Sequence, residues 1–347
     1  MLARATSVLV AAWIVGSGHA DLEIRETNRL VHCHWDRLGH DCVRALARDG
    51  VLRVMGVPGL VSARKAAFDG LARCVHPHAH ALPHVLPDGT RRFTIAARTV
   101  NGEAEQTEPK GCDVQGDELR QAVREATQRL VALLDASAPS GRGHEGGPMG
   151  VGTAAMGSTN FSAPYHSLTR LYDAGEQLEH FHAYQLRSAR QASTSGSVLP
   201  ARDGPSARLV ARAPTSAQGS TIPLHVDDGL LLTLVPPSIR ELPEEGRRTA
   251  GQGADAVGRD LNPTGSSLGL FVRMADGSLV SAAADPVDPG ADTAAEDASS
   301  LLFVVGQGWR TWLSPLLATR LRPAPHSVEL AAVAAAAAEV AAEAGGR

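Results

Sequence analysis

The chain has 347 residues, of which 43% are hydrophobic and 4% are aromatic, so it can form a sizeable core built mainly from aliphatic side chains. Its 33 basic and 37 acidic residues give a formal net charge of −4, which provides no electrostatic attraction to nucleic acid or to an anionic membrane surface. The composition therefore argues against a nucleic-acid partner.

Residues 1–20 have the composition of a targeting segment. Arg4 precedes an apolar run from Ser7 to Gly16, and Gly18 and Ala20 place small side chains where a signal peptidase inspects them. The run is too short to span a bilayer comfortably. We predict a cleaved signal peptide at 1–20, with secretion or residence in the lumen of the secretory pathway, and no membrane contact after its removal. An uncleaved anchor and a chloroplast targeting segment remain as alternatives.

The four cysteines all lie in the N-terminal third of the chain, at Cys33, Cys42, Cys74 and Cys112. An even number of cysteines behind a signal peptide suggests two disulfides, for which three connectivities are possible. The alternative is four unpaired buried thiols. No spacing has the CxxC form, so a zinc ribbon is not expected.

The pattern of apolar residues in the first part of the chain predicts helices and a few strands. Apolar residues at helical spacing up to Asp49-Gly50 predict a helix, and Val51–Val54 predicts the strand that follows it. Residues 61–74 resume a helical pattern, and 93–100 resemble a strand.

A long amphipathic helix is predicted from Asp117 to Leu134, with its apolar residues in one stripe. The Gly-, Ser- and Pro-rich segment that follows, 136–157, has no periodicity and predicts a loop or linker. We therefore place the boundary of an N-terminal helical portion, 21–157, at the end of this segment.

From residue 158 to 330 the pattern changes to short apolar strands separated by turn residues. The predicted strands are 178–187, 207–212, 221–224, 230–235, 268–274, 278–282, 301–305 and 320–328. Such a series predicts a mostly β fold with flanking helices, with a double-stranded β-helix (jelly roll) as its core. Residues 331–347 form an Ala-rich tail with little to bury.

Three residues of this portion are candidate metal ligands. His225 and Asp227 are two residues apart, so on a strand both side chains would leave the same face, and His326 lies in a second strand-like segment. Two histidines and one carboxylate form the facial arrangement that binds non-haem Fe(II) and leaves the other coordination positions open. His182 and Tyr184 share one face of the strand predicted at 178–187, and we consider them candidates for the lining of a co-substrate or substrate pocket.

The segment around His225 resembles the iron-binding motif of the isopenicillin N synthase-like, 2-oxoglutarate and Fe(II)-dependent oxygenases, His-x-Asp-x-Gly-Leu-Leu-Thr. The matching residues, with one extra Leu allowed, are His225, Asp227, Gly229, Leu230, Leu231 and Thr233. The segments 269–280, 302–308 and 321–328 are similar to later strands of that family, in the same order. The resemblance implies an Fe(II) enzyme in which O2 and 2-oxoglutarate oxidise, most simply hydroxylate, a small-molecule or peptide substrate.

One family feature is absent from this sequence. Members carry an Arg-x-Ser about ten residues after the second metal-binding His, where the guanidinium pairs with the far carboxylate of 2-oxoglutarate. Here Val333–Val340 contains only Ala, Val and Glu, and the one later cation is Arg347. Either Arg273 or Arg187 substitutes, or the C-terminal sequence is not authentic, or 2-oxoglutarate is not used. The alternatives are then an isopenicillin N synthase-like oxidase that needs no 2-oxoglutarate, or a catalytically inactive jelly-roll binding protein.

Overall fold

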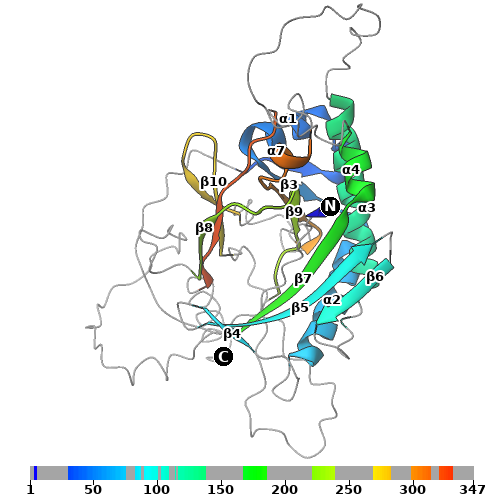
Figure 1. The fold of residues 1–347 in the computed structure, drawn as a ribbon, viewed down its shortest axis with the longest axis vertical. Helices are drawn as coiled ribbons and strands as arrows, with labels where there is room; N and C mark the ends of the chain where they lie inside the picture. The colour runs from blue at the N-terminus through cyan, green and yellow to red at the C-terminus, as the bar shows by residue number, and fades with distance from the viewer. Residues whose placement is uncertain are drawn as a thin grey trace, which may run out of the picture.

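The computed structural model describes residues 4–5, 30–75, 83–86, 90–100, 103–108, 114, 116–137, 167–185, 221–238, 269–282, 298–313 and 320–330. These residues form three sheets and several helices (Figure 1). Among them, no helix is long and apolar enough to cross a membrane.

The N-terminal part alternates helices with short strands. Its elements are β2 (His32–His34), η1 (Trp35–Arg37), α1 (His40–Asp49), β3 (Val51–Met55) and α2 (Leu60–Cys74). Helix α1 ends at Gly50, whose φ of 75° is a left-handed conformation that glycine adopts without steric cost. The predicted helix, stop and strand around Asp49-Gly50 are thus confirmed.

The largest sheet has the order β1-β7-β5-β4, with β6 also paired to β5. Its strands are β1 (Arg4–Ala5), β4 (His84–Val85), β5 (Arg91–Val100), β6 (Glu103–Glu108) and β7 (Glu176–Gln185). Strands β5 and β7 are antiparallel over nine residue pairs, from Arg91 opposite Gln185 to Thr99 opposite Gln177. This long pairing fixes which residues of the two strands share a face.

Helices cover one face of this sheet. Helix α3 (Asp117–Ser137) and the short α4 (Leu168–Ala174) lie alongside β7, with α2 nearby, whereas β8 and β10 lie on the other side of β7 (Figure 1). Phe181 of β7 is fully buried in the same cluster as Leu119 and Leu130 of α3. The odd-numbered residues of β7 therefore face the helices, and the even-numbered ones face away from them.

The C-terminal strands form two further sheets, with the orders β2-β3-β12-β9 and β11-β10-β13-β8. Their bounds are β8 (Ile222–His225), β9 (Leu231–Leu234), β10 (Leu270–Arg273), β11 (Leu279–Ser281), β12 (Leu301–Val305) and β13 (His326–Val328); α7 (Trp309–Trp312) follows β12. Apart from the parallel pair β2–β3, the pairings in both sheets are antiparallel. The strands expected from the sequence between residues 221 and 328 are thus confirmed in their approximate positions.

The architecture is mixed α/β with several antiparallel sheets, which confirms the coarser part of the predicted fold class. Strands β2 and β3 extend the sheet that contains β9 and β12, so the two portions distinguished in the sequence share one sheet. The predicted boundary near residue 157, the strand at 207–212 and the tail at 331–347 lie outside the described residues. So does the expected signal peptide, except for Arg4–Ala5, which pair in parallel with Glu176 and Gln177 of β7.

The structure contains a disulfide between Cys33 and Cys42. Cys74 is also disulfide-bonded, and Cys112 lies outside the described residues. The expectation of disulfides is therefore confirmed for these three cysteines, and the alternative of unpaired thiols does not hold for them.

Candidate metal centre

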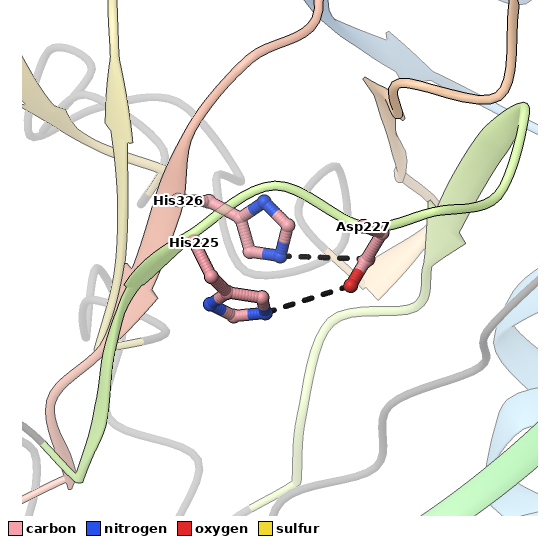
Figure 2. Close-up of side chains that lie close together, drawn as sticks. All are labelled: His225, Asp227 and His326. Atoms are coloured by element: carbon pink, nitrogen blue, oxygen red, sulfur yellow. Dashed lines mark ion pairs between the residues drawn. The ribbon is translucent and has the colours of Figure 1, made fainter.

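Three side chains from two separate parts of the chain converge at one point. His225 is the last residue of β8, Asp227 lies two residues beyond it, and His326 is the first residue of β13. Their ligand atoms all lie within 4.8 Å of one another. Nε2 of His225 is 3.5 Å from one Asp227 carboxylate oxygen, and Nε2 of His326 is 3.6 Å from the other (Figure 2).

Strand pairing brings the two histidines together. Strands β8 and β13 are antiparallel, and His225 lies directly opposite His326, so their side chains leave the sheet on the same face. The centroids of the two imidazole rings are 4.4 Å apart. The pairing irregularity between His326 and Val328 places a local distortion beside the second ring.

Asp227 reaches the site by a different route from the one expected. The sequence predicts His225 and Asp227 on one strand, but β8 ends at His225, and Asp227 lies in the loop that follows. The carbonyl of Asp227 accepts a hydrogen bond from the backbone N–H of Gln307, at 2.8 Å. A turn after β12, and not the alternation of a strand, therefore holds the carboxylate toward the histidines.

The turn that holds this loop is made by Gly306, Gln307 and Gly308. The N–H of Gly308 donates to the carbonyl of Gly229, and the Gln307 amide donates to the Asp228 carboxylate. A Cβ on Gly306 would lie 2.2 Å from the Gly229 oxygen, so only glycine fits at this approach.

Both imidazoles present the same nitrogen to Asp227. Nδ1 of His225 is 2.8 Å from the carbonyl oxygen of Pro223, and Nδ1 of His326 is 3.3 Å from that of Ala324. A carbonyl oxygen can only accept, so each Nδ1 carries a hydrogen, and in the neutral form of each ring Nε2 keeps a lone pair. Such a backbone partner fixes the tautomer of histidines that bind metals.

The three groups differ in burial, and their pKa values differ accordingly. The His326 side chain is 6% exposed, and burial lowers the pKa of its imidazole, which keeps it neutral. For His225, 39% exposed, the protonated ring donates from Nε2 to the Asp227 carboxylate, and this hydrogen bond raises the pKa. Burial alone would raise the pKa of Asp227, but the hydrogen bond from His225 and the charges of the nearby histidines outweigh it, so the pKa is lowered. Asp227 is thus held as a carboxylate.

The two other site residues expected from the sequence lie on β7. His182 and Tyr184 are both buried on the even-numbered face of that strand, and they are not part of the triad. The residue of β7 that couples electrostatically to Asp227 is His180, one step closer along the same face. The alternation of His180, His182 and Tyr184 was the sequence signal for this face, but spacing alone could not show which of them lies nearest the triad.

The donor set fits a divalent transition metal. Neutral imidazole nitrogens with one carboxylate suit Fe(II), and cis ligands about 2.1 Å from an octahedral ion lie about 3 Å apart. The two distances from the histidine nitrogens to the Asp227 oxygens, 3.5 and 3.6 Å, exceed that spacing by about half an ångström. Asp227 and His225 are 29% and 39% exposed, so one side of the triad remains accessible to a ligand.

No protein-family model matches this chain, and no curated protein sequence matches it. The structure is similar to that of dioxygenase for auxin oxidation 1 from Arabidopsis thaliana, solved in complex with 2-oxoglutarate: the TM-score is 0.39 at 12% identity, covering 87% of each chain. It is also similar to the dioxygenase for auxin oxidation in rice, with a TM-score of 0.32 at 16% identity, covering 87% of this chain and 78% of the other.

Proposed function

We propose that the protein is a non-haem Fe(II) oxygenase that couples oxidative decarboxylation of 2-oxoglutarate to the oxidation, most simply the hydroxylation, of an organic substrate. The observation that carries this proposal is the convergence of His225, Asp227 and His326, whose ligand atoms lie within 4.8 Å of one another. Two histidines and a carboxylate on one face of an ion are the arrangement of this class of enzyme.

The proposed fold places the triad in the mouth of a double-stranded β-helix. In this proposal, the sheets β11-β10-β13-β8 and β2-β3-β12-β9 are its two walls. The chain passes from β8 in one sheet to β9 in the other directly after His225, and Asp227 lies in that connection. A ligand bound at the triad would therefore lie where the two walls are joined.

Each residue of the triad has a separate task in this proposal. His225 and His326 would donate neutral nitrogen lone pairs, and Asp227 would neutralise part of the metal charge. Bound Fe(II) would supply the redox chemistry by which O2 converts 2-oxoglutarate to succinate and CO2 and oxidises the substrate. The hydrogen bonds from Nδ1 to the Pro223 and Ala324 carbonyls would keep both rings oriented while ligands exchange on the open side.

The partners and the location are proposals of the same kind. We propose O2 and a small-molecule or peptide substrate as partners, and no nucleic acid, because the formal net charge is −4. We propose secretion or residence in the secretory lumen, with cleavage of residues 1–20 as the processing step. The disulfide between Cys33 and Cys42 supports an oxidising compartment.

Metal titration of the purified protein tests the proposal. Mn(II), a redox-stable substitute for Fe(II), should bind with a stoichiometry of one in anaerobic calorimetry, and His225→Ala should lose this binding because one of three donors is gone. His34→Ala is the matched control, since His34 is an exposed histidine remote from the triad in the sequence. Its Mn(II) affinity should equal that of the wild type.

The co-substrate is tested separately in the Fe(II)-loaded protein. Release of succinate from 2-oxoglutarate in the presence of O2 should occur in the wild type and be lost in His225→Ala. Metal binding and O2 uptake without succinate would favour the isopenicillin N synthase-like oxidase. If the protein binds no metal, it is not an oxygenase, and the catalytically inactive binding protein is the alternative that remains.

A further inference from the structure

Strand β7 has one edge that its sheet leaves largely unpaired. On the other edge it pairs with β5 along residues 177–185. On the first edge only the first two residues of β7 are paired, with Arg4 and Ala5 of β1. No described residue hydrogen-bonds the backbone of residues 179–185 on that edge. Most of one edge of this strand is therefore open.

The open part of β7 is not exposed to solvent. Phe181, His182, Ala183 and Tyr184 are each at most 7% exposed, with the main chain included. Buried N–H and C=O groups without partners cost free energy, and nearly all such groups in folded proteins are paired. We therefore expect a further strand along this edge of β7.

Arg4 and Ala5 fix the direction and the register in which a strand can add there. They run parallel to β7, and the N-terminus of the chain lies beside that strand (Figure 1). In a parallel pair, each further residue of one strand lies opposite the next residue of the other. Residues 6–13 are thus in register with 178–185, and Trp13 is opposite the last residue of β7.

The sequence of residues 6–13 suits this place. Thr6, Val8 and Val10 are β-branched, and the segment contains no charged residue, Gly or Pro. Strands that are buried on both faces have such continuous apolar runs instead of an alternating pattern. The Ala-rich tail, 331–347, is a poorer match, because Ala and Glu favour helix over strand.

Both faces of β7 offer suitable neighbours to this segment. Residues opposite each other in adjacent strands share a face, so the register places Leu9 beside Phe181, which is buried in the cluster with α3. It places Val8 beside His180, the residue of β7 that couples electrostatically to Asp227. A strand here would pack on the helix-covered core with one face and line the surroundings of the triad with the other.

We propose that residues 6–13 add to β7 as a parallel strand in the uncleaved chain, with Ala11 opposite Ala183. This inference goes beyond the proposed function, because it needs neither the metal nor a co-substrate. It bears on the proposed processing, since cleavage after residue 20 would remove the strand and open the edge of β7 beside His180. Until that step, the segment covers an edge that could otherwise pair with another chain.

Cross-linking of the full-length chain tests the register. The double variant Ala11→Cys/Ala183→Cys places two thiols directly opposite each other, whereas the matched control Ala12→Cys/Ala183→Cys places them on opposite faces. After oxidation with diamide, the Ala11 variant should give at least about tenfold more cross-linked peptide than the Ala12 variant, as measured by mass spectrometry. The intact mass confirms that residues 1–20 are retained.

Hydrogen exchange of the full-length wild type gives a readout that needs no substitution. Amides of residues 6–13 that bond to β7 should exchange at least about a hundredfold more slowly than those of an unstructured peptide. Val10→Pro removes an N–H in the middle of the strand and should restore fast exchange in the segment. Ile14→Pro is the matched control, because Ile14 lies beyond the residue opposite the end of β7, and it should leave the protection intact.

The two measurements together decide the question. Selective cross-linking of the Ala11 variant and protection of residues 6–13 would support the strand. Equal or absent cross-linking in folded variants would overturn the register. Fast exchange throughout residues 6–13 of the wild type would overturn the strand itself, and this result stands even if a cysteine variant fails to fold. Neither measurement involves the metal, so Mn(II) binding tests the proposed function separately.

Discussion

The histidines of the triad and those of β7 show how the same side chain is prepared for different tasks. Nδ1 of His225 and of His326 each donates to a backbone carbonyl two residues earlier, so the nitrogen that faces Asp227 is the one with a lone pair. His182 is instead buried beside a cation, and burial, followed by the charges of Arg92 and His180, lowers its pKa from 6.5 to about 3. Its imidazole is neutral over the whole physiological range.

The buried imidazole of His182 makes the free energy of unfolding depend on pH. The pKa of His182 is lower in the folded than in the unfolded chain. The stability that its neutral imidazole contributes to the fold is therefore complete above pH 6.5 and is lost as the pH falls from 6.5 toward 3. Lowering the pH from 7 to about 4.5 should therefore cost the metal-free wild type about 3 kcal/mol more than it costs His182→Asn. Urea unfolding at the two pH values measures this difference. Identical pH dependence in the two proteins would contradict it.

At the scale of elements, the metal loop depends on the turn that follows β12. The backbone N–H groups of Gly306, Gln307 and Gly308 all donate to carbonyls of residues 227–230, which joins the end of one strand to the loop between two others. The carboxylate of Asp227 is thus positioned by backbone contacts made about eighty residues away in the chain. A substitution in this turn should therefore weaken metal binding even though it replaces none of the three ligands.

Gly306→Ala tests this dependence. The added Cβ would meet the Gly229 oxygen at 2.2 Å and the Asp227 oxygen at 2.8 Å, so the loop must move. We expect a loss of about 2 kcal/mol in the free energy of unfolding and a Mn(II) affinity weakened about tenfold.

The control for this variant is Gly39→Ala. A Cβ on Gly39 would lie 3.7 Å from its nearest neighbour, an ordinary contact, so this change should leave the Mn(II) affinity unaltered. Urea unfolding and Mn(II) titration of both variants give the comparison. A Gly306→Ala protein that binds Mn(II) like the wild type would show that the turn does not set the position of Asp227.

At the scale of the whole molecule, distant parts of the chain build common sheets. Strand β12 lies between β3 near the N-terminus and β9 near the metal loop, and β5 pairs with β7 across the expected linker at 136–157. Strands β2 and β3 are therefore part of the framework around the site. A disulfide in that region, Cys33–Cys42, should stabilise the whole fold.

The double variant Cys33→Ala/Cys42→Ala measures that stabilisation. Removing a link that closes a loop over a sequence separation of 9 should lower the free energy of unfolding by about 2.5 kcal/mol, because the unfolded chain gains conformational freedom. Urea unfolding without reductant gives the value. In dithiothreitol the difference between wild type and variant should disappear, and a difference that persists would assign the loss to packing at these buried positions.

The local elements and the identities of the candidate ligands could be predicted from the amino-acid sequence alone. Apolar periodicity placed helix α3 and the short strands from β8 to β13, since the side-chain period of a strand or a helix is a local property. The motif around His225 and Asp227, together with His326, named the three residues that the structure brings together.

How these residues come together depends on contacts between distant parts of the chain. Asp227 lies past the end of β8 and is held by a turn whose residues follow β12, a contact that no local pattern encodes. The position of Arg92 opposite Tyr184 depends on the register of β5 against β7, and a shift of one residue would turn Arg92 to the helix-covered face. Register and turn packing are set by long-range pairing and burial, which is why spacing along the chain could propose the ligands but not the contacts that hold them in place.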